Sequence, residues 1–402
     1  MTKQLSTALL WLIVVIIALP QLTETIYSPS LPEIAKALSV DESWVEFTLT
    51  IYLLGFAVGS LFWGKLSDYK GRKPCLLMGL FIYILGCVGC YFSTSIEMLL
   101  FSRFVQAFGG SVGSVLVQAI CRDSFEGVAL GKVYSVLGSA IAFTPAIGPV
   151  LGGVLAEHFG WNAIFLVLIG FGSLLLLISS ITLHETHPIE NRVSHSLVGV
   201  LNRLIKDQKV LSFAFIVGAG NGIAFSYYAE GSFYLIDQLG LTPSQYGSSF
   251  IGIAVIGAIG GMVSRKLQEK YSSLSILYRG LMILLAGTTL FSVLTILFSF
   301  MSLPGIYNIA LTLASMIIIM TGIGMVLPNA LSLALKDYRD AIGTASSLMG
   351  FGYYIIVSLC TLGMALLHND TLFPMPLYFL VIACSMFIVF KVVLKERDPS
   401  SG

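Results

Sequence analysis

Charged residues are scarce in this chain. Asp, Glu, Lys and Arg make up 11% of its 402 residues, while hydrophobic residues make up 56%. A soluble domain carries about a quarter charged residues and fewer than half apolar ones. The formal net charge of +1 is also too small to attract nucleic acid. The composition therefore argues against a soluble domain and a nucleic-acid-binding protein, and it indicates a membrane protein.

The motifs of common enzyme classes are missing as well. The five histidines lie outside the interiors of the long apolar runs and show no metal-ligand spacing. The six cysteines are scattered singly through apolar stretches, which is typical of small core residues. The chain has no G-x-S-x-G motif and no phosphate-binding loop. We therefore expect no enzymatic activity, no metal, no cofactor and no use of ATP.

The chain does contain twelve apolar runs that are long enough for transmembrane helices of about twenty residues. An apolar run after Lys3 resembles a signal peptide, but no cleavage site of small residues follows it, so we interpret it as the first span. The predicted spans are residues 7–28, 44–66, 74–93, 96–120, 132–156, 161–183, 210–236, 245–266, 274–299, 305–330, 339–365 and 374–394.

The basic residues predict the orientation. An even number of spans places both termini on one side. If that side is cytoplasmic, all Lys and Arg residues except Lys36 and Arg103 lie there, which is 20 of the 22. This satisfies the positive-inside rule. We expect a multi-pass protein of a bacterial inner membrane with both termini in the cytoplasm, present as a monomer in the lipid bilayer.

The two halves of the chain repeat. Gly55, Gly64 and Ser67 in the second span recur as Gly252, Gly261 and Ser264 in the eighth. Residues 184–209 hold three histidines, one proline and an excess of charge, which indicates a cytoplasmic linker. The predicted fold is an all-α membrane protein of two pseudo-symmetric six-helix bundles, at residues 1–183 and 210–402. Such repeats are associated with transporters whose halves rock against each other.

The connection between the second and third spans carries the first functional motif. Gly64 allows close helix approach, Gly71 permits a tight turn, and Pro74 suits the first turn of a new helix. Asp68 lies at a helix C-terminus, where the dipole disfavours a negative charge, so a cation must hold it. Arg72 is the nearest candidate.

Residues 64–74 (Gly-Lys-Leu-Ser-Asp-Tyr-Lys-Gly-Arg-Lys-Pro) resemble the signature loop of the major facilitator superfamily, G-x-L-x-D-x-x-G-R-R/K. The resemblance implies that Asp68 and Arg72 belong to a charge network that locks the cytoplasmic face in one state and releases it in the other. Arg103, Gln106 and Ala107 are similar to the R-x-x-Q-G motif of the same superfamily, with Ala in place of Gly.

The fifth span resembles the G-P-x-x-G-G motif of the exporter branch of this superfamily. Gly148 and Gly152 form a face of small residues for close packing, and Pro145 and Pro149 remove backbone donors and bend the helix. Gly153 completes the motif. Packing is the expected role of these residues, and the resemblance favours export over import.

Three shorter strings resemble drug:proton antiporters of the bicyclomycin/chloramphenicol-resistance type. They are residues 27–32 (Tyr-Ser-Pro-Ser-Leu-Pro), Arg122 with Asp123 at the inner end of the fourth span, and residues 343–348 (Gly-Thr-Ala-Ser-Ser-Leu). The resemblance as a whole covers nearly the full chain. We include Arg122 and Asp123 among the candidate gating residues.

Ionisable residues inside spans cost a few kcal/mol and mark functional sites. Glu24, Arg103 and Glu230 are predicted in the outer halves of the first, fourth and seventh spans. Desolvation raises the pKa of a carboxyl group and a nearby arginine lowers it, so Glu24 could bind a proton in step with conformation if Arg103 approaches in one state only. The alternatives are a structural ion pair, or a carboxylate that reaches the outer headgroups. Glu230 is a candidate second proton site.

Aromatic and amide side chains at similar depths are candidates for a substrate cavity that suits lipophilic or cationic ligands. They are Tyr27, Tyr52, Gln106, Gln118, Asn221, Tyr227 and Tyr228. Each of them could equally be a packing residue.

The function that these observations favour is export of small lipophilic or cationic compounds in exchange for protons. A proton-coupled carrier of a specific metabolite or siderophore is the alternative within transport, where Arg103 would suit an anionic group. A channel or a membrane sensor is the alternative from another class.

Overall fold

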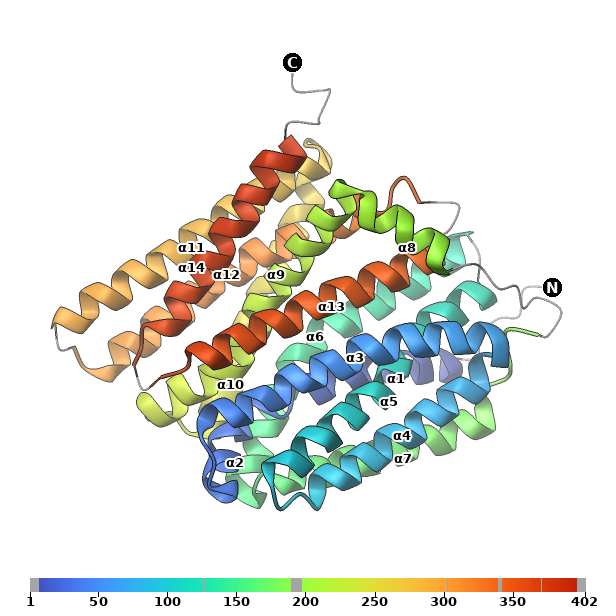
Figure 1. The fold of residues 1–402 in the computed structure, drawn as a ribbon, viewed down its shortest axis with the longest axis horizontal. Coiled ribbons are helices and arrows are strands. Elements are labelled where there is room, and N and C mark those ends of the chain that lie inside the picture. Colours follow the sequence, from blue (N-terminus) through green and yellow to red (C-terminus); the bar gives the residue numbers. More distant parts are fainter. Residues whose placement is uncertain are drawn as a thin grey trace. The chain divides into compact units, whose positions relative to one another are not determined.

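The computed structural model describes residues 7–125, 127–188, 197–301, 303–338, 342–369 and 371–395, and their regular structure is helical throughout. The chain divides into two compact units, Met1–His195 and Ser196–Gly402. Figure 1 follows the helices of both units along the chain. The division falls inside the predicted linker, at residues that lie outside the described ranges.

The described residues contain twelve helices that are long and apolar enough to cross a membrane, six in each unit. This confirms the predicted all-α membrane fold. Large apolar side chains face outward along these helices: Phe101 is 71% exposed, Ile181 is 72% exposed and Phe300 is 82% exposed. Water does not favour so many exposed apolar groups, but the hydrocarbon of a bilayer does.

In the first unit α5 packs against α1, α3 and α4, and α4 also packs against α7 (Figure 1). The helices of this unit are α1 (Thr7–Thr25), α2 (Leu31–Leu38), α3 (Glu42–Lys70), α4 (Arg72–Tyr91), α5 (Ile96–Ser124), α6 (Gly127–Phe159) and α7 (Asn162–Thr182). α5 therefore holds the side chains of its inner face between several neighbouring helices.

The first span is longer than predicted, because its helical path continues past residue 28. A 3-10 turn, η1 (Ser28–Ser30), joins α1 to α2, and the span runs from Leu10 to Leu38. Pro29 and Pro32 each stand in the first turn of a new element, where the missing backbone N–H costs nothing. The predicted end at residue 28 is wrong for that reason.

Glycines of α6 let this helix approach the end of α1. A Cβ atom on Gly148 would collide with the Oγ1 atom of Thr25, and one on Gly152 would collide with the carbonyl oxygen of Ile26. Pro145 and Pro149 both lie inside α6, which continues through them. Gly153 is buried beside Gly152.

In the second unit α9 packs against α12, α13 and α14, and α12 also packs against α10 and α11. The elements are α8 (Leu197–Lys206), α9 (Gln208–Ser232), η3 (Phe233–Gln238), α10 (Pro243–Leu267), α11 (Ser273–Met301), α12 (Gly305–Ala334), α13 (Ile342–Leu367), α14 (Pro374–Val389) and η5 (Phe390–Lys395). Residues 339–341 of the predicted eleventh span lie outside the described ranges.

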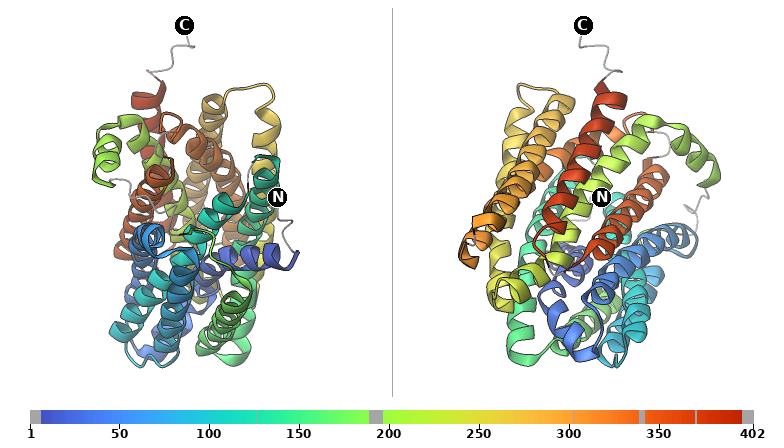
Figure 2. Two further views of the ribbon diagram at one scale, coloured as in Figure 1. Left: turned by 90° about the vertical axis from the view of Figure 1, so that its right-hand side faces the viewer. Right: turned by 60° about the vertical axis from the view of Figure 1, so that its left-hand side comes forward.

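The linker predicted at residues 184–209 contains a helix. α8 packs against α13 and turns away from the axis of α9, as both Figure 1 and Figure 2 show. Asp207 separates the two helices, and its carboxylate accepts hydrogen bonds from the backbone N–H groups of Lys209 (2.9 Å) and Val210 (3.3 Å). This cap starts α9 where the polar segment ends.

Because α6 lies so close to the end of α1, we expect that replacing a contact glycine of α6 by alanine lowers the stability of the fold. Gly152→Ala places a methyl group against the Ile26 carbonyl and should destabilise the fold by about 1–3 kcal/mol. The measurement is thermal unfolding of the purified protein in detergent, with a midpoint several degrees lower expected.

The matched control is Gly138→Ala on the same helix, where a Cβ atom would meet nothing within 4 Å. Equal midpoints for the two variants would contradict the proposed contact.

Candidate functional site

A buried arginine is the centre of a polar cluster in the first unit. The guanidinium carbon of Arg103 lies 4.3 Å from the ring centroid of Tyr27 and 4.2 Å from that of Tyr52. Its Nη1 atom donates a hydrogen bond of 2.6 Å to the Oε1 atom of Gln106, one turn away on α5. Arg103, Tyr27, Tyr52, Gln106 and the neighbouring Glu24 are called the Arg103 cluster below. All five are members of the predicted sets.

Glu24 and Arg103 are both fully buried, with exposed fractions of 0%. The two side chains are close enough for the charge of Arg103 to act on the Glu24 carboxyl group. Neither Glu24 carboxylate oxygen has a hydrogen-bond partner, and the Nε and Nη2 atoms of Arg103 have none either. Burying such groups without partners is costly, and it is common at sites that bind a ligand or a proton. The cluster can therefore take up a proton, a cation or an anionic group.

A second layer of hydrogen bonds supports this cluster, and sequence reasoning missed its members. Thr48 of α3 donates to the Tyr27 hydroxyl at 3.1 Å. The Nε2 atom of Gln106 donates to the Sγ atom of Cys87 at 3.0 Å. The hydroxyls of Thr23 and Tyr83 share a hydrogen bond of 2.9 Å. Four helices thus fix the orientation of the tyrosines and of Gln106.

Glu230 is fully buried in the second unit and has a partner that the sequence did not reveal. Its Oε2 atom lies 2.8 Å from the Nδ1 atom of His368, which directly follows α13. The Oε1 atom of Glu230 has no hydrogen-bond partner. His368 also packs against the ring of Phe233, with centroids 5.4 Å apart. A carboxylate and an imidazole in direct contact can hold one or two protons between them.

Two of the predicted cavity residues join an aromatic cluster in the second unit. Tyr228 stacks on Phe250 with ring centroids 5.0 Å apart, and Tyr227 lies 5.4 Å from the same ring. The Tyr246 hydroxyl donates to the carbonyl oxygen of Tyr227 at 3.3 Å. These contacts bury Tyr227 completely, so packing accounts for most of its surface.

The hydrogen bonds at Gln118 and Asn221 are made with residues outside the predicted cavity set. The side chain of Gln118 is exposed on α5, and its backbone oxygen accepts a hydrogen bond from Tyr134 at 3.4 Å. Asn221 is half-buried, and its amide donates to the Val217 carbonyl of its own helix at 3.0 Å.

A charge network joins three helix ends in the first unit. The Nη1 atom of Arg72 donates to Asp68 at 2.6 Å and to the Ser67 hydroxyl at 2.7 Å. Its Nε atom donates to the Oδ2 atom of Asp123 at 2.9 Å. These bonds tie the start of α4 to the ends of α3 and α5. We call Ser67, Asp68, Arg72 and Asp123 the Arg72 network.

Two glycines near this network shape the backbone that carries Asp68 and Arg72. Gly71 is the sole residue between α3 and α4, and its φ of 97° is one that other residues rarely adopt. Gly64 lies inside α3, one turn before Asp68, and its carbonyl accepts from the Ser67 hydroxyl at 2.9 Å. Arg122 is exposed, and the Arg72 guanidinium bonds to the carboxylate of its chain neighbour Asp123.

Glu185, after the end of α7, extends the Arg72 network. Its carboxylate accepts hydrogen bonds from the backbone N–H groups of Arg72 (2.8 Å) and Lys73 (3.2 Å). A carboxylate at a helix N-terminus accepts hydrogen bonds from backbone N–H groups that have no partner within the helix, and its charge is favourable at the positive end of the helix dipole. The Nδ1 atom of His187 lies 4.0 Å from Asp123. The start of the predicted linker is therefore anchored to the candidate gate.

The second unit holds an uncharged counterpart. The Nδ2 atom of Asn329, on α12, donates to the hydroxyl of Ser264 on α10 at 2.8 Å. The Nε2 atom of Gln268 donates to the Oδ1 atom of Asn329 at 3.1 Å. Ser264 is the residue that the repeat pairs with Ser67. Sequence reasoning found the serine but not its buried partner.

Comparison with known proteins finds one matching family model and relatives that are named as transporters or resistance proteins. A family model described as Major Facilitator Superfamily matches residues 13–361. A protein of Rickettsia bellii named "Uncharacterized transporter" is 35% identical over 387 residues, covering 96% of each chain. A protein of Haemophilus influenzae named "Bicyclomycin resistance protein homolog" is 30% identical over 380 residues, covering 93% of each chain.

The fold is also found among solved structures. The xylose transporter XylE from E. coli superimposes with a TM-score of 0.74 at 13% sequence identity, covering 96% of this chain and 98% of that one. At this identity the likeness concerns the fold alone.

The contacts of Glu185 lead to a prediction about the start of α4. Glu185→Ala removes the carboxylate from the Arg72 and Lys73 amides and should weaken the first turn of α4 by about 1 kcal/mol. We expect hydrogen–deuterium exchange in the first turn of α4 to become roughly fivefold faster. Glu97→Ala, at an exposed acid of α5, is the control. Unchanged exchange in the Glu185 variant would show that this carboxylate does not cap α4.

Proposed function

Because this chain belongs to the major facilitator superfamily, we propose that it exports small lipophilic or cationic compounds from the bacterial cytoplasm in exchange for protons. Transport would proceed by alternating access of its two units. The proteins of this superfamily are transporters and not enzymes, which supports transport over the channel or sensor considered above. The name of the Haemophilus relative, a bicyclomycin resistance protein homologue, and the exporter-type motif of α6 support the outward direction.

The observation that carries the proposal is the buried Glu24 carboxylate with two unpartnered oxygens beside Arg103. Burial favours the neutral form of a carboxyl group, and a nearby guanidinium favours the charged form. A movement that changes the separation of these groups therefore changes how tightly Glu24 holds a proton. The same carboxylate can accept a cationic compound after it releases the proton, and this competition couples the two flows.

Arg103 is the proposed modulator of this carboxylate. The tyrosine rings on both sides compensate part of its lost hydration through cation–π contacts. The guanidinium keeps two nitrogen atoms without partners, so its hydrogen-bonding capacity is not used up by Gln106. These two nitrogen atoms therefore remain available to Glu24.

The Arg72 network is the proposed gate on the side that the basic residues predict to be cytoplasmic. Arg72 holds the ends of α3 and α5 together only while both aspartates stay in reach. Opening that side would separate α4 from one of these ends. Charge-assisted hydrogen bonds of this kind are each strong enough to bias a two-state equilibrium.

One observation favours a second candidate function. The unpartnered Nε and Nη2 atoms of Arg103 are suited to a carboxylate or another anionic group. A proton-coupled carrier of a specific anionic metabolite would use Arg103 for binding, and Glu24 for the proton alone.

The first test separates these functions in everted membrane vesicles with an imposed pH gradient. The wild-type protein should accumulate a cationic dye by up to about tenfold per pH unit for each proton exchanged. Glu24→Gln should abolish this accumulation, because the amide cannot exchange a proton. Glu97→Gln, at an exposed acid of α5, should leave it unchanged.

Undiminished proton-driven transport by a normally inserted Glu24→Gln variant would overturn the assignment of Glu24. Wild-type transport that survives collapse of the gradient would remove antiport altogether. Gradient-driven movement of anionic metabolites but not of cationic dyes, lost in Arg103→Gln, would favour the second function.

The contact of Glu230 with His368 generates a separate prediction. If this pair carries a second proton, export of a monovalent cation moves net charge and gains about 2.3 kcal/mol per 100 mV of membrane potential. We expect wild-type export to respond to the potential. Glu230→Gln should lose this response and keep the response to the pH gradient.

His368→Gln is the companion variant, because it removes the imidazole and leaves the carboxylate in place. Wild-type export of a monovalent cation that ignores the potential would show that Glu230 and His368 carry no coupled proton.

A further inference from the structure

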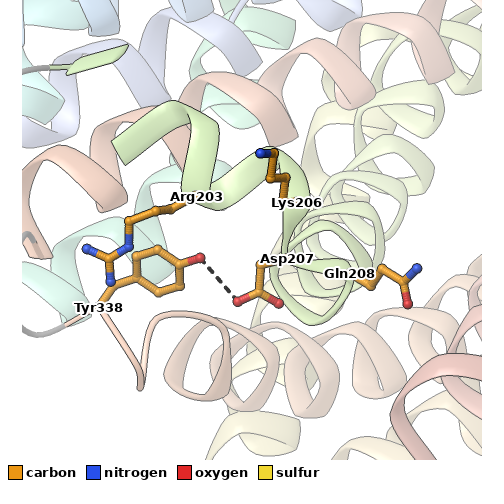
Figure 3. A pocket seen from close by; sticks show the side chains of 5 residues that line it. All are labelled: Arg203, Lys206, Asp207, Gln208 and Tyr338. Carbon is orange, nitrogen blue, oxygen red and sulfur yellow. Dashed lines mark hydrogen bonds between the residues drawn. The ribbon is translucent and has the colours of Figure 1, made fainter. Parts of the chain in front are cut away.

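An open cavity of 590 Å³ lies where α8 meets α9 in the second unit (Figure 3). Its lining residues are Arg203, Lys206, Asp207, Gln208 and Tyr338. In Figure 3 Arg203 and Tyr338 stand at one end of the cavity and Gln208 at the other. The proposed transport cycle uses none of these residues.

Contacts among Arg203, Tyr338 and Asp207 hold the walls of this cavity together. The guanidinium carbon of Arg203 lies 4.9 Å from the ring centroid of Tyr338. The Tyr338 hydroxyl donates to the Oδ2 atom of Asp207 at 3.1 Å. Burial and the neighbouring Asp207 charge raise the pKa of Tyr338, so its hydroxyl keeps the proton that it donates. The loop between α12 and α13 is thereby joined to the α8–α9 corner.

The charge of the cavity favours an anion. Asp207 is the acidic group of the lining, and both of its oxygens already accept hydrogen bonds, from Tyr338 and from two amides of the α9 N-terminus. The dipole of α9 further offsets its charge. Arg203 and Lys206, by contrast, are exposed on one face of α8, three residues apart. A phosphate group between them would meet two cations.

The other faces of α8 show where such a phosphate belongs. Val200 and Leu204 are buried on the side of α8 that is packed against α13. Leu201 and Ile205 are 39% and 57% exposed on the adjoining side. A short helix with an exposed apolar pair beside basic residues lies in the headgroup region of a bilayer, with its apolar side toward the acyl chains. α9 enters the membrane directly after Asp207.

We propose that this cavity binds the phosphate group of an anionic phospholipid, with Arg203 and Lys206 as its cationic contacts. Leu201 and Ile205 lie against the acyl chains of the same lipid. The Lys and Arg distribution predicts that this corner faces the cytoplasmic leaflet, whose anionic lipids attract basic segments. The exposed apolar pair argues for a lipid rather than for free phosphate. The bound lipid would fasten the α8–α9 corner and the α12–α13 loop to the bilayer surface.

The test titrates the full-length, delipidated protein in non-ionic detergent with phosphatidylglycerol and counts bound lipid by native mass spectrometry. Each basic residue near a membrane surface accounts for about a fivefold change in lipid affinity. Arg203→Gln combined with Lys206→Gln should therefore weaken retention roughly 25-fold. Lys206→Gln alone should weaken it about fivefold, and it leaves the contact of Arg203 with Tyr338 intact.

Lys270→Gln is the matched control, because Lys270 is an exposed lysine of the same unit that does not line the cavity. It should retain phosphatidylglycerol like the wild type. Phosphatidylcholine should bind more weakly than phosphatidylglycerol, and millimolar inorganic phosphate should not displace the lipid.

Three results would overturn the proposal. Equal retention by the wild type and the Lys206→Gln variant would show that the cavity is not the lipid site, even where the double variant folds poorly. Equal retention of phosphatidylcholine would show that the charge plays no part. Displacement of phosphatidylglycerol by inorganic phosphate would identify free phosphate, not a lipid headgroup, as the ligand.

Discussion

A guanidinium group that leaves water for a helix bundle must recover much of its lost hydration, and Arg103 does so between two tyrosine rings and one amide oxygen. The rings come from α3 and from the chain just after α1, so these elements must lie close to α5. Glycines make this possible: a Cβ atom on Gly55 would lie 2.7 Å from the Phe104 carbonyl oxygen. The position of Glu24, and with it the proposed coupling, depends on this packing.

The two units hold equivalent helix ends together with different hydrogen bonds. Ser67 and Ser264 occupy matching places in the repeat, and each accepts a hydrogen bond near the end of a long helix. In the first unit the donor is Arg72, which also binds two carboxylates. In the second unit the donor is Asn329, and its partners are neutral. Charge-assisted bonds depend strongly on solvation, whereas amide bonds do so less. We therefore expect the Arg72 network to be more sensitive to the entry of water or ions than the Asn329 contacts.

Hydropathy was enough to predict the helical fold and the twelve spans of the described residues, apart from the end of the first span, because a bilayer imposes helix length directly. The Asp68–Arg72 contact was also predictable, because a carboxylate at a helix C-terminus needs a cation and Arg72 follows it closely in the sequence. The residues that contact Glu230 and the N-terminus of α4 could not be predicted from the sequence. His368 and Glu185 lie 138 and 113 residues away from the groups that they contact, in segments that look like ordinary polar connections. The tyrosines around Arg103 were named as cavity residues, but only the packing of helices brings their rings onto the guanidinium.

The connection at Gly71 has a consequence for how this part of the protein can vary. A single residue joins two helices of 29 and 20 residues, and its left-handed backbone sets the angle at which α4 leaves α3. Surface loops usually tolerate changes in length. Here one residue inserted at the start of α4 would shift the register of its side chains by about 100° around the helix axis. Arg72 would then point away from Asp123, and the Arg72 and Lys73 amides would turn away from Glu185. The length of this one-residue connection is thus constrained by the contacts on both of its sides.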